Sequence, residues 1–165
     1  MPDRGDAMKM RLRLRAKALD AVALGLPAPP PQHPNVCGAV VDIEADGERF
    51  ATLVAMGEGS TSLYTSGQVF IGGGKHAVVR QATHAFLAEL ANHLARGEPD
   101  PDGAFPPPGI VRFHVLTPDA RLFLDMPQSE FLGTAPMTEP DLVMAAHAVV
   151  TALRAAAQAR SSGGS

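Results

Sequence analysis

The run Ile71-Gly72-Gly73-Gly74-Lys75-His76 is the part of the sequence best suited to bind a charged ligand. It separates a predicted strand from a predicted helix, and free backbone amides at a helix start, with a lysine nearby, can hold phosphate or carboxylate. The candidate anion-binding residues are Gly72, Gly73, Gly74, Lys75 and His76. The run is not a P-loop, because Val69 stands where that motif has its first glycine and no Ser or Thr follows Lys75. A tight chain reversal made by the glycines is the simpler interpretation, and we favour it.

The six histidines do not have the spacing of a metal site. His76, His84 and His93 fall on one predicted helix, but separations of eight and nine residues put them too far apart along the axis for one metal ion. His33 lies in a Pro-rich segment and His147 on the last predicted helix. The exception to consider is His114, which shares the polar face of a predicted strand with Arg112. We therefore predict no metal and no cofactor.

Nucleophilic and acid–base chemistry also find little support. Cys37 falls on the apolar face of a predicted hairpin, which is typical of a buried core thiol. Asp42, Glu44 and Glu48 form an acidic group, but they lie at the wet end of that hairpin, where Arg49 is expected to pair with Glu44. We assign no catalytic residue, and we leave the question of enzymatic activity open while favouring a protein that is not an enzyme.

Length and charge limit the classes of function. The chain has 165 residues, of which 45% are hydrophobic, and this size suits one domain with its own core. The formal charge is −3, but six basic and three acidic residues in the first twenty leave the remainder at −6, which argues against nucleic acid as a partner. With one cysteine, and with Asp20 interrupting the apolar run of any signal peptide, we expect a cytoplasmic protein. We expect no membrane span, and the Arg-rich, Lys-poor usage is typical of a high-GC bacterial genome.

The N-terminal part predicts a basic amphipathic helix. Helical periodicity over Ala7–Leu26 places apolar residues on one stripe flanked by basic residues. The stripe consists of Met8, Leu12, Ala16, Leu19, Ala23 and Leu26. Pro27–Pro34 then predicts a stiff, extended linker. We divide the chain into this helix with its linker (1–34), one α+β domain (35–160) and a disordered tail (161–165).

The segment from Val36 to Met56 predicts a β-hairpin, since Asp46-Gly47 is a strong signal for a two-residue turn. Placing Ala45 opposite Glu48 fixes the register. The resulting apolar face pairs Ile43 with Phe50, Val41 with Thr52, Ala39 with Val54 and Cys37 with Met56. The opposite face pairs Glu44 with Arg49 and Asp42 with Ala51, and it should be exposed near the turn.

The rest of the chain predicts further strands and two more helices. Strands are expected at Thr61–Thr65, with a short piece at Val69–Ile71, and in a second hairpin at Ile110–Thr117 and Arg121–Met126; helices are expected at His76–Arg96 and after Thr138. Glu98–Gly109 is expected to be an exposed connection and Met126–Met137 a loop. The fold class is α+β, with one antiparallel sheet of about five strands and three helices in the order α-β-β-β-α-β-β-α. This order resembles that of roadblock, longin and profilin domains, in which a five-stranded antiparallel sheet lies between helices.

These features predict a protein that acts through protein–protein contacts, as a homodimeric scaffold or a subunit of an assembly. The candidate contact residues lie on the first helix and are Leu12, Leu19, Arg11 and Arg15. Docking of that helix on another surface, or use of an uncovered sheet edge, would supply the contact. The alternative is a domain that binds an anion or small molecule, with or without catalysis, at Gly72–His76. Attachment of the basic helix to a membrane surface is a weaker third hypothesis.

Overall fold

The computed structural model describes residues 4–20, 35–45, 49–66 and 68–163. These residues form α1 (Arg4–Leu19), β1 (Gly38–Ala45), β2 (Arg49–Met56), β3 (Thr61–Thr65), β4 (Val69–Phe70), α2 (Ala77–Ala91), β5 (Glu98–Pro99), β6 (Ile110–Leu116), β7 (Arg121–Pro127), α3 (Gln128–Phe131) and α4 (Pro140–Gly163). Two short 3₁₀ turns, η1 (Gly73–Lys75) and η2 (Leu94–Arg96), flank α2.

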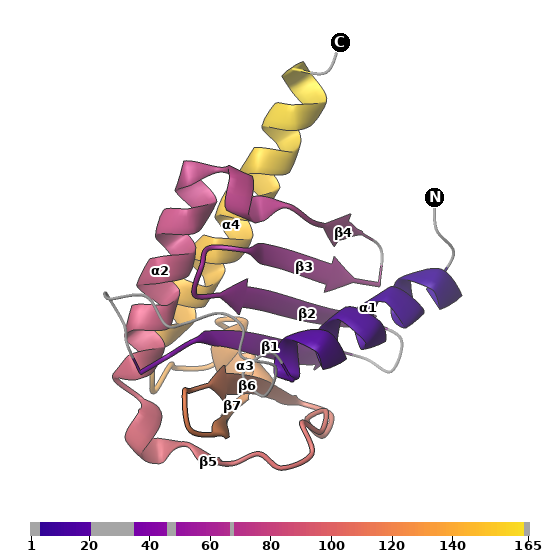
Figure 1. Cartoon of the computed structure of the whole chain (residues 1–165). Helices are drawn as coiled ribbons and strands as arrows, with labels where there is room; N and C mark the ends of the chain where they lie inside the picture. Colours follow the sequence, from indigo (N-terminus) through magenta and orange to yellow (C-terminus); the bar gives the residue numbers. More distant parts are fainter. Residues whose placement is uncertain (1–3, 21–34, 46–48, 67, 164–165) are drawn as a thin grey trace.

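All seven strands belong to one antiparallel sheet with the order β4-β3-β2-β1-β6-β7-β5. Helix α1 lies across one face of the sheet, while α2 and α4 lie on the other (Figure 1). The α+β class with a single antiparallel sheet is thus confirmed. The expected five strands and three helices are too few. The short piece expected at Val69–Ile71 forms β4 at one edge, β5 adds a two-residue strand at the other, and α3 forms within a segment expected to be a loop. Such short edge strands leave little backbone open to unwanted pairing.

Two apolar cores lie on the two faces of the sheet. The larger one joins alternate residues of β1 and β6, such as Val41 and Phe113, to the inner stripes of α2 and α4. The second lies beneath α1 and contains Val40, Tyr64 and Leu116. Because consecutive strand residues point to opposite faces, each central strand supplies both cores. The buried stripe of α4 consists of Leu142, Ala146, Val149 and Leu153, while Val150 is half-buried.

The predicted hairpin register is wrong by one residue. Ala45 pairs with Arg49, so the connection is the three residues 46–48, and Asp42 lies opposite Thr52. Ile43 therefore pairs with Ala51 and Glu44 with Phe50. A one-residue slip changes every cross-strand partner. The pattern of apolar residues could not decide between the two registers. Strand β1 is apolar on both faces between Ala39 and Val41, so its residues are buried in either register.

Several element boundaries also differ from the prediction. Helix α1 begins earlier and ends at Leu19, and the proposed linker Pro27–Pro34 lies outside the described residues. The predicted helix His76–Arg96 is divided into α2 and η2. The segment after Glu98 is not simply exposed, since it contains β5 and the buried Asp100. Helix α4 continues to Gly163, past the point at which the tail was expected to begin.

Within the part of the chain that the structure describes, α4 is also long and apolar enough to span a membrane by length and composition. The expectation that the chain has no membrane span stays a prediction, because length and composition alone do not decide it. One third of the segment Pro140–Ala159 is buried inside the protein, where it packs against α2 and the sheet. A core helix of a soluble protein passes the same test, so this composition alone does not place α4 in a membrane.

Candidate functional site

Two arginines of α1 point into the protein rather than into solvent. Arg11 and Arg15 are four residues apart, so they share one face of the helix. Arg11 is only 1% exposed and Arg15 is also buried. Both had been expected at the edge of a contact surface, together with Leu19, which is buried as well. The structure therefore docks α1 on the chain's own sheet and leaves Leu12 as the exposed member of the predicted contact set.

The arginines reach a buried acceptor group at the centre of the sheet. Arg15 binds the Oδ2 atom of Asp42 through both Nε, at 2.9 Å, and Nη2, at 2.7 Å. Arg11 donates from Nε to the hydroxyl of Thr52 at 2.7 Å, and Thr52 donates in turn to Asp42 Oδ1 at 2.7 Å. Arg11 Nη2 also binds Glu44 at 2.7 Å. The observed register makes this possible, because it places Asp42 directly opposite Thr52 on the α1 face.

His114 on β6 extends this group of hydrogen-bonded side chains across the sheet and connects it to Asp100, which directly follows β5. Its Nε2 lies 2.8 Å from Asp42 Oδ2, and its Nδ1 lies 2.7 Å from Asp100 Oδ2. A ring with a carboxylate at each nitrogen is satisfied best as an imidazolium, which donates at both positions. Arg121 adds a second cation 3.4 Å from Asp100. We call Arg11, Arg15, Asp42, Thr52, Asp100 and His114 the polar network.

The charges of the polar network shift the titration of its members. Burial by itself would raise the pKa of Asp42, yet the hydrogen bonds and positive charges of His114 and Arg15 lower it to about 2. Burial would likewise lower the pKa of His114, whereas the hydrogen bonds to Asp100 and Asp42 and their negative charges raise it above 6.5. At neutral pH the buried carboxylate of Asp42 is therefore ionised, with Arg15 and His114 within hydrogen-bond distance of it.

Aromatic rings close the polar network from outside. The guanidinium of Arg11 lies between the rings of Phe50, at 4.1 Å, and Phe105, at 4.7 Å. Phe105 also covers Arg15 at 3.8 Å. Among the described residues no buried side-chain nitrogen or oxygen lacks a hydrogen-bond partner. The polar network has a histidine and two carboxylates but is satisfied and closed to solvent, so its geometry serves to fix α1 rather than to turn over a substrate.

An open groove lies beside the closed polar network. It encloses about 620 Å³ between α1 and the segment that leads into β6. Its walls are mainly apolar and come from Met8 and Leu12 on one side and from Phe105, Pro106 and Pro108 on the other. Glu44 lies in the groove with its charge engaged by Arg11. We call this the α1 groove, and it contains the one predicted contact residue, Leu12, that remains exposed.

The glycine turn, Gly72–Lys75, has a packing explanation. Gly72 has a φ of 80°, which a glycine adopts without strain. At Gly73 a Cβ atom would lie 2.6 Å from Leu153 Cδ2 and 2.8 Å from the carbonyl oxygen of Thr61, so no side chain fits. At Gly74 it would lie 3.1 Å from the carbonyl oxygen of Gly59. The glycines therefore let the turn lie directly against the β2–β3 connection, in addition to the tight chain reversal that the simpler interpretation predicted.

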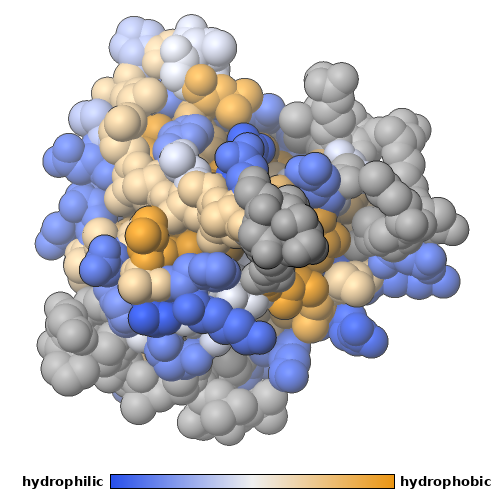
Figure 2. All heavy atoms as spheres, turned by 90° about the horizontal axis from the view of Figure 1, so that it is seen from above, coloured by the Kyte–Doolittle hydropathy of each residue, from blue (hydrophilic) through white to orange (hydrophobic). Residues whose placement is uncertain are grey.

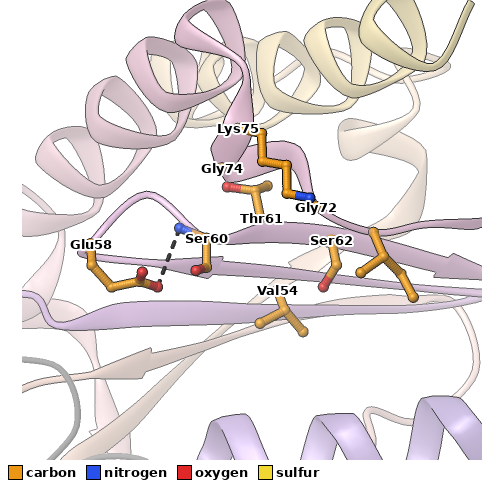
Figure 3. A pocket seen from close by; sticks show the side chains of 9 residues that line it. Val54, Glu58, Ser60, Thr61, Ser62, Gly72, Gly74 and Lys75 are labelled. Atoms are coloured by element: carbon orange, nitrogen blue, oxygen red, sulfur yellow. Dashed lines mark hydrogen bonds between the residues drawn. The ribbon is translucent and has the colours of Figure 1, made fainter. Parts of the chain in front are cut away.

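A pocket of about 350 Å³ opens beside this turn. It is lined by Gly72, Gly74 and Lys75 together with the side chains of Ser60, Thr61 and Ser62 (Figure 3). Glu58 also lines it, and its carboxylate accepts a hydrogen bond from the backbone of Ser60 at 3.3 Å. Of the predicted anion-binding residues, Gly73 is buried in packing and His76 is not part of the lining, so the structure brings three of the five together.

The remaining candidates are dispersed over the fold. His93 lies near Glu89 and Glu139, and His147 Nε2 lies 2.7 Å from the carbonyl oxygen of Phe131, while His33 is outside the described residues. No group of three metal-ligating side chains occurs among the residues with described positions. Cys37 is a buried free thiol, as predicted, and burial raises its pKa.

Comparison of the chain with known proteins does not indicate a family or a function. No family model matches the chain, and neither a curated protein nor a solved structure matches it significantly. The resemblance in element order to roadblock and profilin domains therefore has no structural match behind it. Function has to be argued from the surfaces of this molecule.

Sequence reasoning missed the polar network, although a signal was present. Asp42 interrupts an otherwise apolar stretch from Ala39 to Ile43, and Arg11 and Arg15 are spaced for one helix face. A lone acid within an apolar strand and a pair of arginines on a nearby helix are typical of a buried ion pair, since buried charges need partners. The error lay in assuming that every basic residue of the helix faces water.

Proposed function

We propose that the chain acts through protein–protein contacts, as a homodimeric scaffold or assembly subunit. The observation that supports this is the outer face of α4. Met144, Ala148, Thr151 and Ala155 are all exposed, and their 4-3-4 spacing places them in one line along the helix. Met144 is 62% exposed. None of these four residues is charged, exposed Asp141 continues the line one turn before Met144, and none of the described elements covers the four residues.

Such a face suits contact with a second copy of itself. A two-fold interface places the same patch against itself, so a patch without charge avoids like-charge repulsion. Small side chains such as Ala148 and Ala155 also allow two helices to approach closely. Figure 2 shows hydrophobic residues at the surface in patches interrupted by hydrophilic side chains.

A charge placed in the middle of this line tests the proposal. Ala148→Arg should reduce the particle mass measured by light scattering from that of a dimer to that of the 17.2 kDa chain. The matched control is Arg154→Ala, which removes a charge from the flank of the same helix and should leave the mass unchanged. A mass that Ala148→Arg does not alter would show that α4 is not the interface.

A second candidate is an anion-binding function at the glycine turn, supported by Lys75 and three hydroxyl-bearing residues around one pocket. Glu58 in the same pocket opposes anion binding. A bound ligand would raise the melting temperature in proportion to its concentration. If phosphate, nucleotides and simple carboxylates leave the melting temperature of the wild type unchanged, this candidate is dismissed, and a rise that Lys75→Ala abolishes would support it.

A further inference from the structure

The charged residues that border the α1 groove determine which kind of partner can bind there. Leu12 is 44% exposed at the rim, and Phe105, opposite it, is 36% exposed. At 100° per residue, Lys9 and Arg13 lie about 60° and 100° from Leu12 around the helix, on the side turned away from the sheet. Both are exposed, as is Lys17 one turn beyond Arg13. The apolar groove is thus bordered on its α1 side by a basic stripe.

The side chains of the basic stripe are available to bind a partner, in contrast to the two buried arginines of α1. The guanidinium groups of Arg11 and Arg15 are engaged in hydrogen bonds to Thr52, Glu44 and Asp42. Within the described residues, Lys9, Arg13 and Lys17 have no ion-pair partner. Because the inner arginines fix the rotation of α1 about its axis, the positions of Leu12 and the basic stripe relative to the groove are fixed as well.

We propose that the α1 groove and the basic stripe together form the docking site for an acidic, amphipathic segment of a partner protein. An apolar side chain of that segment occupies the groove between Leu12 and Phe105, and its acidic residues lie over Lys9 and Arg13. Helices and extended peptides dock in this way when an apolar face fits a groove and flanking charges set the orientation. A second copy of this chain does not suit the site through the same surface, since two basic stripes would face each other.

The site is distinct from the proposed dimer interface, although it shares the premise that the chain works through protein contacts. The α1 groove lies on one face of the sheet, whereas α4 lies on the other (Figure 1). The two proposals can therefore fail separately. A groove variant leaves the dimer mass unchanged, and an α4 variant leaves peptide binding unchanged.

Binding of two designed peptides by the full-length protein tests the docking site. Both are short amphipathic helices with the same leucine spacing, and they carry either glutamate or lysine at the flanking positions. Fluorescence anisotropy should show tighter binding of the glutamate peptide, weakening as salt is added. Amide shifts in NMR spectra should change around Met8, Leu12 and Phe105. Equal affinity for the two peptides, or shift changes confined to another surface, would overturn the proposal.

Substitutions test separately the two parts of the docking site, the basic stripe and the α1 groove. Lys9→Glu with Arg13→Glu should weaken the glutamate peptide about tenfold, because each reversed surface charge changes affinity by a few-fold. Leu12→Asp should abolish binding to the groove. Lys75→Glu reverses an exposed lysine beside the other pocket and is the matched control, which should bind like the wild type. A loss of the same size in the control, or stronger binding to vesicles containing phosphatidylserine than to the peptide, would contradict a peptide-docking site.

Discussion

Replacing Asp42 with asparagine removes the charge on which the docking of α1 depends while keeping the shape of the side chain. In the wild type, Asp42 accepts hydrogen bonds from Arg15, Thr52 and His114, and it is fully buried. Asparagine retains a single acceptor oxygen. Its amide group would meet donors of the polar network, so one or more buried groups would lose a partner.

The expected loss can be worked from the structure. Removing one member of a buried ion pair costs about 3–5 kcal/mol, because the partner charge stays buried without compensation. The pKa of Asp42 gives an independent figure. A decrease from 3.8 to about 2 means that the folded state stabilises the ionised carboxylate, and roughly two units correspond to about 2–3 kcal/mol. We expect Asp42→Asn to lower the free energy of unfolding by about 3–5 kcal/mol, the larger figure including the orphaned partners.

Urea denaturation followed by circular dichroism measures this loss as a shift in midpoint. Asp119→Asn, at an exposed position in the β6–β7 turn, is the matched control and should change stability by less than about 0.5 kcal/mol. Limited proteolysis within α1 (Arg4–Leu19) would report release of this helix if the sheet itself stays folded. A loss below about 1 kcal/mol, with α1 still protected, would refute the argument that the polar network fixes the helix.

Other variants and conditions test the same structure at separate points. Arg15→Ala should cost about 3–5 kcal/mol, whereas Arg112→Ala, which breaks a more exposed pair with Asp125, should cost about 1 kcal/mol or less in the same urea assay. Stability should be highest between about pH 4 and 6.5: the contribution of Asp42 is lost as pH falls from 3.8 towards 2, and that of His114, whose pKa is raised, is lost as pH rises above 6.5. A flat pH profile of thermal stability would contradict this. Gly73→Ala should destabilise by about 1–3 kcal/mol through overpacking against Leu153, and equal stability to the wild type would exclude the close contact.

The spacing of apolar residues in the sequence was enough to predict the helices that bury one continuous apolar stripe. The apolar positions of α2 recur at helical spacing, and Val79, Phe86 and Leu90 are fully buried as that spacing predicts. The strands of both hairpins were also identified, because turn residues bound them and branched or aromatic residues fill them. The edge strand β4 falls on the short piece expected at Val69–Ile71, whereas β5, with two residues, is too short for any alternation to be visible and was missed.

The polar network could not be derived from periodicity, because its members come from distant parts of the chain. Arg15 and Asp42 are 27 residues apart, and Asp42 and His114 are 72 apart. Helical periodicity treats arginine as a residue that faces water, yet Arg11 is among the largest fully buried side chains. The register error hid the same feature, since it placed Asp42 at the exposed end of the hairpin and not opposite Thr52.

The glycine turn was located correctly, and a tight chain reversal there was foreseen from the conformational freedom of glycine. That it binds an anion stays a prediction. Leu12 was selected from the apolar stripe, and it does line an open groove. The opposite wall of that groove could not be foreseen, because Phe105 belongs to a Pro-rich segment that has no periodic pattern and is positioned by its contacts with the two buried arginines.

Sedimentation equilibrium of the full-length protein over a range of concentrations tests the central proposal, that the chain works through contacts with a second copy of itself, most directly. Specific homodimers commonly form at or below about 1 μM. At tens of micromolar the proposal predicts a particle of twice the 17.2 kDa chain mass, with dissociation only on dilution. A mass of 17.2 kDa at every concentration would contradict it.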